Sequence, residues 1–113
     1  MTIDIRTATA EQLAEYVLNA RGYSLEDNGF WVRRSDGATV YVALFVCSLD
    51  LIADAMPPGW RWTRHGPQGG VVWLSTNKTR GKSCVVDDTG NERLDRLRLA
   101  ALAWEAESKE ASK

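Results

Sequence analysis

Residues 57–76 read PPGWRWTRHGPQGGVVWLST, and this stretch decides the fold class. Proline cannot continue a helical hydrogen-bond ladder, so the Pro-Pro-Gly at its start predicts the end of a helix. Two runs rich in β-forming residues follow, at 60–65 and 71–76, and a segment rich in glycine separates them. This pattern is typical of a β-hairpin. The chain is therefore expected to pass from a helix into an antiparallel sheet at this corner.

The sequence before the corner predicts two helices. Thr9 and Gln12 have the spacing of a capping box, and apolar residues then recur at helical intervals, so we expect a helix over residues 9–21. Residues 48–56 predict a short helix, which Ser48 caps and the prolines end.

A first hairpin is predicted between these two helices. Residues 30–34 and 39–46 flank Asp36-Gly37, and a two-residue Asp-Gly loop between apolar runs is a strong hairpin signal. The second run is apolar from its second position onward, so we expect this strand to be central in its sheet, with both faces covered. Residues 24–29 are polar and predict a turn.

The last third of the chain predicts one more strand and a long helix. The strand is expected over residues 83–87 and the helix over residues 92–107, which gives the order α-β-β-α-β-β-β-α. This order predicts a single α+β domain over residues 1–113, with a mainly antiparallel sheet of four or five strands and helices packed on it. Residues 1–8 and 108–113 are expected to be frayed ends.

The composition is that of an ordinary globular protein. Hydrophobic residues make up 44% of the 113 residues, charged residues make up 26%, and the formal net charge is −1. No run reaches the ~20 apolar residues of a membrane span, and residues 1–9 carry Asp4 and no apolar core of a secretory signal. We therefore expect a cytoplasmic protein without membrane contact, in which Cys47 and Cys84 are buried, reduced thiols.

One segment of the chain is basic. Residues 55–86 contain no Asp or Glu, although the chain as a whole is slightly acidic. Such an asymmetry inside one small chain indicates a face that meets an anionic molecule or an acidic protein surface. The partner-binding residues that it predicts are Arg61, Arg64, Lys78, Arg80 and Lys82.

Three tryptophans lie in the same segment, Trp60, Trp62 and Trp73. Trp60, Trp62 and Arg64 alternate along one predicted strand, so their side chains are expected on the same side of the sheet. Two interpretations stay open. The tryptophans either pack under a helix, or they form a stacking platform beside basic residues, as in proteins that bind single-stranded nucleic acids. Tryptophan and arginine are also enriched at protein-binding hot spots.

The last helix carries apolar residues on two sides. One stripe contains Leu94, Leu97, Ala101 and Trp104, and the other contains Leu99, Leu102 and Ala106. A helix that lies on a sheet needs only one apolar stripe. This helix is therefore either wedged between two elements, or its second stripe forms an interface with another chain, for which a homodimer is the commonest arrangement.

The reactive side chains do not form a recognisable catalytic or ligand-binding pattern. Cys47 and His65 are the candidates for a thiolate–imidazole pair, but the first ends an apolar run and the second lies at a hairpin tip. Gly81-Lys82-Ser83 resembles the end of a phosphate-binding loop, yet the earlier glycine is missing and a strand is expected after it. Asp87-Asp88 is typical of a turn rather than of a cation site. We expect no catalytic residues, no metal and no cofactor, and therefore no enzyme.

Three stretches resemble a family of small phage proteins. They are SLDLIA at residues 48–53, MPPGWRW at residues 56–62 and LRLAALA at residues 97–103. The sequence order is a short helix, a Pro-Gly-Trp corner, a tryptophan-containing hairpin, a third strand and an Ala/Leu-rich helix, and it resembles the phage helix-sheet-helix (ABA) sandwich domain. The resemblance covers residues 48–106 and implies packing motifs without catalytic residues.

The resulting hypothesis is a non-catalytic accessory protein of the phage type. The resemblance and the small size imply that it binds a host protein or ribonucleoprotein in the cytoplasm of a bacterium, and that it inhibits a host defence system such as CRISPR. Two other hypotheses stay open. One is a nucleic-acid-binding module that uses the basic, tryptophan-bearing hairpin, and the other is a protein that sequesters a small molecule or nucleotide in an aromatic pocket.

Overall fold

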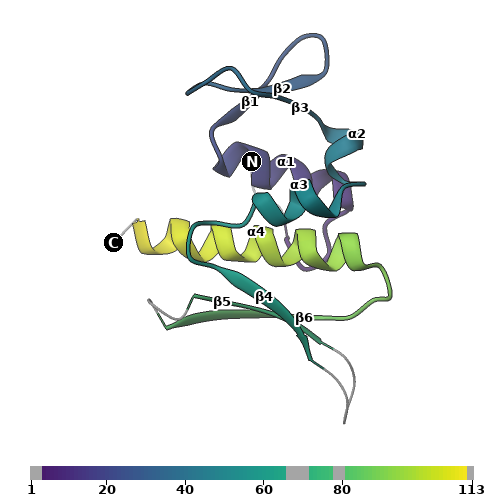
Figure 1. Cartoon of the computed structure of the whole chain (residues 1–113), viewed down its shortest axis with the longest axis vertical. Coiled ribbons are helices and arrows are strands. Elements are labelled where there is room, and N and C mark those ends of the chain that lie inside the picture. Colours follow the sequence, from purple (N-terminus) through teal and green to yellow (C-terminus); the bar gives the residue numbers. More distant parts are fainter. Residues whose placement is uncertain (1–3, 66–71, 78–80, 112–113) are drawn as a thin grey trace.

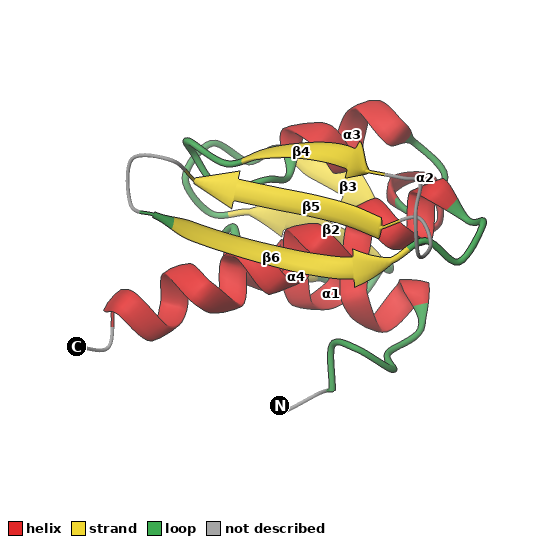
Figure 2. Cartoon of the chain, turned by 90° about the horizontal axis from the view of Figure 1, so that it is seen from below, coloured by secondary structure: helices red, strands yellow, loops and turns green. Residues whose placement is uncertain are grey.

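Two three-stranded sheets lie on opposite sides of a layer of helices (Figure 1). The computed structural model describes residues 4–65, 72–77 and 81–111. Within these residues the element order is α-β-β-β-α-α-β-β-β-α, which confirms the α+β class. The single sheet of four or five strands is wrong, because the strands form two antiparallel sheets of three. Figure 2 shows the second sheet in front of the helices and strands of the first sheet behind them.

The first helix, α1, spans Ala10–Ala20 and begins where the sequence predicts. Thr9 Oγ1 accepts a hydrogen bond from the Gln12 backbone N–H at 3.2 Å, and Gln12 Oε1 accepts one from the Thr9 backbone N–H at 3.0 Å. This capping box gives both N–H groups a partner that the helix itself does not supply. The buried face of α1 consists of Leu13, Ala14, Val17 and Leu18.

The first sheet has the order β1-β2-β3, with β1 at Tyr23–Leu25, β2 at Phe30–Arg33 and β3 at Thr39–Tyr41. The predicted hairpin joins β2 to β3, and Asp36 Oδ1 accepts a hydrogen bond from the Ala38 N–H at its turn, at 3.1 Å. The sequence predicts no strand at β1, where the polar turn was expected to begin. Tyr23 is buried and anchors this strand, which pairs with β2 over three residues.

The expected central strand over residues 39–46 is wrong in its second part. β3 ends at Tyr41, lies at an edge of the sheet, and is followed at once by a short helix, α2, at Val42–Phe45. β2 has four residues and offers pairing partners only as far as Tyr41. Beyond that point the backbone groups need partners within their own segment, and the Val46 N–H donates to the Val42 carbonyl at 3.0 Å.

The next helix, α3, spans Leu49–Asp54, and Ser48 caps it as predicted. The Ser48 hydroxyl oxygen accepts a hydrogen bond from the Leu51 N–H at 3.2 Å. The helix ends before Pro57, in agreement with the predicted corner.

The second sheet is a meander of three longer strands. They are β4 at Arg61–His65, β5 at Val72–Asn77 and β6 at Lys82–Asp87, in the order β4-β5-β6. The predicted second hairpin and third strand are therefore present. Arg61, Thr76 and Ser83 lie opposite one another across the sheet, and this register fixes which residues share a face.

The last helix, α4, spans Glu92–Ala111 and is wedged between the other elements. It contacts α1 and α3 on one side and the second sheet on the other. This arrangement explains why the helix is apolar on two sides. Its first turn is tied to the preceding loop by Asp95, which is fully buried and accepts hydrogen bonds from the backbone N–H and hydroxyl of Thr89, at 3.1 and 2.8 Å. In the described part of the chain, no helix is long and apolar enough to cross a membrane.

Described residues at both ends of the chain contact α4 or belong to it. Ile5 and Ala8 are buried, and Arg98 on α4 donates to both of their carbonyl oxygens, through Nε and Nη2, at 3.0 Å each. This part of the N-terminal segment is therefore bonded to α4. At the other end, α4 continues through the expected frayed segment as far as Ala111.

Candidate binding site at the edge of β4

The corner before β4 fixes where its side chains point. Gly59 has a φ angle of +86°, a left-handed conformation that side chains disfavour, and a Cβ atom here would lie 3.2 Å from Nδ2 of Asn77. The Trp60 N–H donates to the Pro57 carbonyl at 3.2 Å, which closes the turn. The chain leaves this corner with Trp60 and Trp62 toward α4.

Two tryptophan side chains contact α4 directly. Trp60 is 6% exposed, and its indole N–H donates to Glu107 Oε1 at 2.8 Å. The guanidinium carbon of Arg96 lies 4.7 Å from the centre of a Trp62 ring, within the range of a cation–π contact. Both side chains therefore pack under a helix, and the alternative of an open stacking platform does not fit them. The side chain of Trp73 lies outside the described residues.

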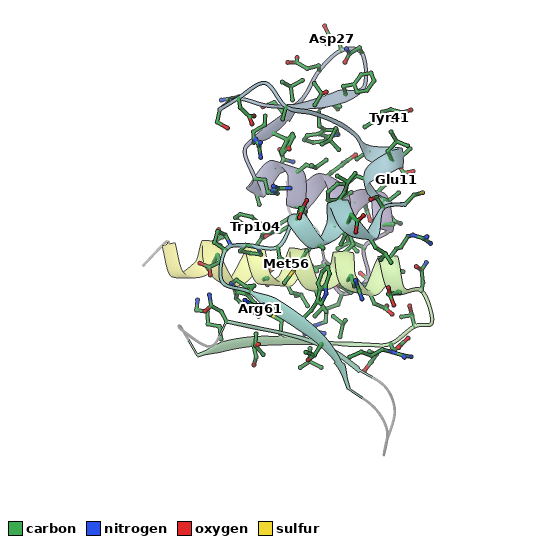
Figure 3. All side chains as sticks on the ribbon, in the orientation of Figure 1. Glu11, Asp27, Tyr41, Met56, Arg61 and Trp104 are labelled. Carbon is green, nitrogen blue, oxygen red and sulfur yellow. The ribbon has the colours of Figure 1, made fainter. Side chains whose placement is uncertain are left out.

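An open hollow of about 250 Å³ lies where α3, the corner and β4 meet. Its lining residues are Ala53, Met56, Trp60, Arg61 and Trp62. Figure 3 shows Met56 beside α4 and Arg61 at the start of β4. Four of the five lining residues are apolar or aromatic, but the exposed lining surface itself is more polar than apolar, and the exposed Arg61 is part of it.

The described basic residues do not form the single face that the sequence predicts. Arg61 is exposed, whereas Arg64 Nε is 2.7 Å from Asp88 Oδ2 and Lys82 Nζ donates to the Ala106 carbonyl on α4 at 3.1 Å. Positions 61 and 64 on one strand face opposite sides of the sheet, and this alternation separates their charges. Lys78 and Arg80 lie outside the described residues.

Asp88 has an electrostatic role within the fold. The Gly90 backbone N–H donates to Asp88 Oδ1 at 2.7 Å, and this bond, followed by the bond from Arg64, lowers the pKa of Asp88 below its ordinary value. The neighbouring Asp87 is exposed at the end of β6. Within the described residues, no group of three or more His, Cys, Asp or Glu side chains could hold a metal ion.

The two cysteines differ in exposure. Cys47 is exposed after α2, which contradicts the expected burial, and Cys84 on β6 is half-buried. The early end of β3 explains Cys47, because the apolar run does not reach the interior as a strand. The side chain of His65 lies outside the described residues. Gly81 leads directly into β6, so Lys82 and Ser83 already belong to a strand, and the helix that a phosphate-binding loop needs does not follow them.

The apolar stripe on α4 that was proposed as an oligomer interface lies mostly in the interior of the molecule. Leu99 is completely buried, Leu102 is 8% exposed and Ala106 is half-buried. Because α4 is covered on two sides, these residues pack within one molecule. The wedged alternative therefore agrees with this arrangement, and an interface with a second copy stays a prediction.

The residues that complete the hollow were not identified from the sequence. Met56 and Ala53 belong to the end of the α3 segment, and only the corner geometry brings them beside Trp62. The signal in the sequence is that Met56 directly precedes the two prolines.

Comparisons of the chain with protein-family models, curated proteins and solved structures found no match. Its function must therefore be inferred from the chemistry of its own surface.

Proposed function

We propose that this chain is a non-catalytic binding protein that docks on another protein through the hollow beside β4. The observation that carries this proposal is an open hollow where apolar and aromatic side chains lie beside an exposed arginine. Met56 and Trp62 offer apolar surface, and Arg61 offers an exposed cation beside it. Tryptophan, methionine and arginine are the residue types enriched in the centres of protein interfaces.

The size of the hollow favours a protein partner over a small molecule. Pockets for small ligands have volumes of roughly 300–1,000 Å³ and enclose most of the ligand. The hollow here has about 250 Å³ and is open to solvent, which suits one apolar side chain that projects from a larger partner. Because Arg61 stands at the rim, that side chain is expected beside an Asp or Glu of the partner.

The nucleic-acid hypothesis receives less support from the same region. Stacking of bases needs exposed aromatic faces, but Trp60 is buried and Arg96 covers a face of Trp62. A binding groove for phosphates also needs several cations on one face. Among the described cations of the basic segment, Arg64 and Lys82 are engaged with Asp88 and Ala106.

The phage-type role is part of this proposal. The partner would be a host protein or a ribonucleoprotein in the cytoplasm of a bacterium, and binding would inhibit a defence system such as CRISPR. This part is supported by the resemblance of residues 48–106 to the phage helix-sheet-helix sandwich domain and by small size. The chain would act by occupying a surface of its partner and not by catalysis.

Affinity capture followed by calorimetry tests the proposal. The wild-type chain captures partners from a bacterial lysate, and each identified partner is then titrated with purified variants. We expect Arg61→Glu to weaken binding about tenfold or more, because it reverses a charge at the rim. Arg93→Glu is the matched control, since Arg93 is exposed on α4 and is not one of the residues that line the hollow. Equal affinities of wild type, Arg61→Glu and Met56→Glu, all folded, would contradict the proposal.

A further inference from the structure

The outer face of the first sheet carries a row of one carboxylate and two aromatic rings. The Glu26 N–H donates to the Phe30 carbonyl at 2.9 Å, and Phe30 lies opposite Tyr41 on the next strand. Paired residues on neighbouring strands point to the same face. Trp31 is buried toward the helices, so Phe30 beside it on β2 points outward. Phe30 and Tyr41 therefore share the face that points away from the helices, and the exposed Glu26, directly after β1, is bonded to Phe30 at the end of this face.

The two rings are in contact and unusually accessible. Phe30 is 42% exposed and Tyr41 is 46% exposed, and their ring centres are 5.4 Å apart with an angle of 47° between the planes. In Figure 1 the helices lie below this sheet, and no element of the described chain covers its upper side. Isolated exposed apolar residues are common, but a paired aromatic surface on an uncovered sheet face is typical of an interaction site.

The charge at this end of the sheet is negative. Glu26 and Asp27 are exposed, and Asp27 lies at the tip of the turn between β1 and β2 (Figure 3). Within the described residues, neither carboxylate is engaged in a hydrogen bond or an ion pair. At the far end of the same face, Arg34 Nε donates to the Ser24 hydroxyl at 3.3 Å. The face is therefore polarised, with its aromatic pair at the acidic end.

We propose that this row binds an arginine side chain on the surface of a protein partner. A guanidinium group is planar, stacks on aromatic rings and pairs with a carboxylate through two hydrogen bonds. Phe30 and Tyr41 offer the ring faces, and Glu26, next to Phe30, offers the carboxylate. An apolar partner would satisfy the rings but would desolvate Glu26 without compensation. An anionic partner would be repelled by Glu26 and Asp27.

This second surface is independent of the hollow beside β4. The hollow has a cation at its rim and suits an apolar side chain next to an acidic residue, whereas the row on the first sheet suits a cation. The two surfaces also share no residues, because the hollow is lined by α3, the corner and β4, whereas the row lies on the first sheet. A partner with mixed charge could be held at both places, and each can be tested without the other.

Titration of the isotope-labelled chain with two model peptides, followed by NMR, tests the proposal. One dodecapeptide alternates arginine and glycine, and the other has neutral citrulline in place of each arginine. We expect saturable shifts of the Glu26, Phe30 and Tyr41 amide signals with the arginine peptide only. Glu26→Gln and Phe30→Leu should each weaken binding about threefold or more, because each removes one contact to the cation.

Glu11→Gln is the matched control, since Glu11 is exposed on α1 and its substitution changes the net charge equally. Equal weakening by Glu11→Gln would show attraction by net charge alone and would overturn the proposal. Equal binding of the citrulline peptide would show an apolar surface, and a wild-type dimer that Phe30→Leu dissociates would show a second copy as the occupant. Either result would also overturn it. Circular dichroism confirms that each variant is folded.

Discussion

The two sheets have the same strand order and the same antiparallel pairing, but they are held in the molecule differently. The strands of the first sheet have three or four residues, and the helix that follows them, α2, has four. The strands of the second sheet have five or six residues, and α4 behind them has twenty. A short three-stranded sheet is marginal unless a large apolar face is buried.

The two sheets also differ in the side-chain contacts that join them to the helices. The second sheet is tied to α4 by polar contacts, from Trp60 to Glu107 and from Lys82 to the Ala106 carbonyl. The first sheet places Tyr23 and Trp31 in the core, while Phe30 and Tyr41 on its other face stay exposed. The same strand order therefore occurs once in a longer sheet with a hollow at its edge and once in a smaller sheet with an exposed aromatic pair on its outer face.

The largest expected effect is the loss of stability when a charge is placed on the buried helix α4 rather than on the exposed helix α2. Leu102→Glu places a charge in the 8%-exposed site between the layers, so we expect a loss of more than about 4 kcal/mol of unfolding free energy. Leu44→Glu, on α2 at 65% exposure, is the matched substitution and should change stability by less than about 0.5 kcal/mol. Urea denaturation followed by circular dichroism measures both.

The same pair also tests the buried position of the stripe on α4. If light scattering shows a dimeric wild type, and Leu102→Glu is a folded monomer, the stripe is an interface after all. A monomeric wild type with an unfolded Leu102→Glu variant would agree with the wedged helix.

A smaller loss of stability is expected from alanine at the glycines that precede or join strands of the two sheets. Gly59 and Gly37 have φ angles of +86° and +75°, so alanine costs about 1–2 kcal/mol at each. At Gly59 the new Cβ also meets the buried Asn77 side chain at 3.2 Å, whereas nothing lies within 4 Å of it at Gly37. We therefore expect Gly59→Ala to destabilise the protein more than Gly37→Ala in thermal denaturation. Equal losses would mean that Asn77 moves aside without cost.

Local signals in the sequence predict much of this fold. The capping box at Thr9, the Asp36-Gly37 loop and the Ser48 cap act within a few residues, so their helices and hairpin are found where expected. β1 and α2 depend on distant partners. The length of β2 decides that the chain pairs only as far as Tyr41, and no local pattern in residues 39–46 contains that information.

The candidate site was less predictable than the fold. Arg61, Arg64 and Lys82 lie close in the sequence, but strand alternation and the position of α4 separate them. The hollow needs residues of α3, the corner and β4 to come together, a tertiary arrangement that composition does not encode. The row of Glu26, Phe30 and Tyr41 was not predicted for a related reason, because Glu26 lies directly after the unpredicted strand β1, which places it beside Phe30.

The smallest expected effect concerns two aspartates, one at each sheet. Arg33 Nε donates to Asp36 Oδ1 at 2.9 Å beside the first sheet, and this contact, with the Ala38 N–H, lowers the pKa of Asp36 to about 2. Near the second sheet, the Gly90 N–H and Arg64 lower the pKa of Asp88 below its ordinary value of 3.8. A carboxylate with a lowered pKa in the folded state stabilises that state above its ordinary pKa, and the contribution is lost as the pH falls through the folded value. Both contributions are therefore present at neutral pH and should decline below about pH 4.

Because Arg64 and Arg33 are solvent-accessible, salt should weaken both contributions to stability. NMR titration of the carboxyl carbons measures the two pKa values directly, and Arg33→Gln and Arg64→Gln should each raise only the pKa of its own partner. If Arg33→Gln left the pKa of Asp36 at about 2, backbone hydrogen bonds and not the ion pair would be its cause.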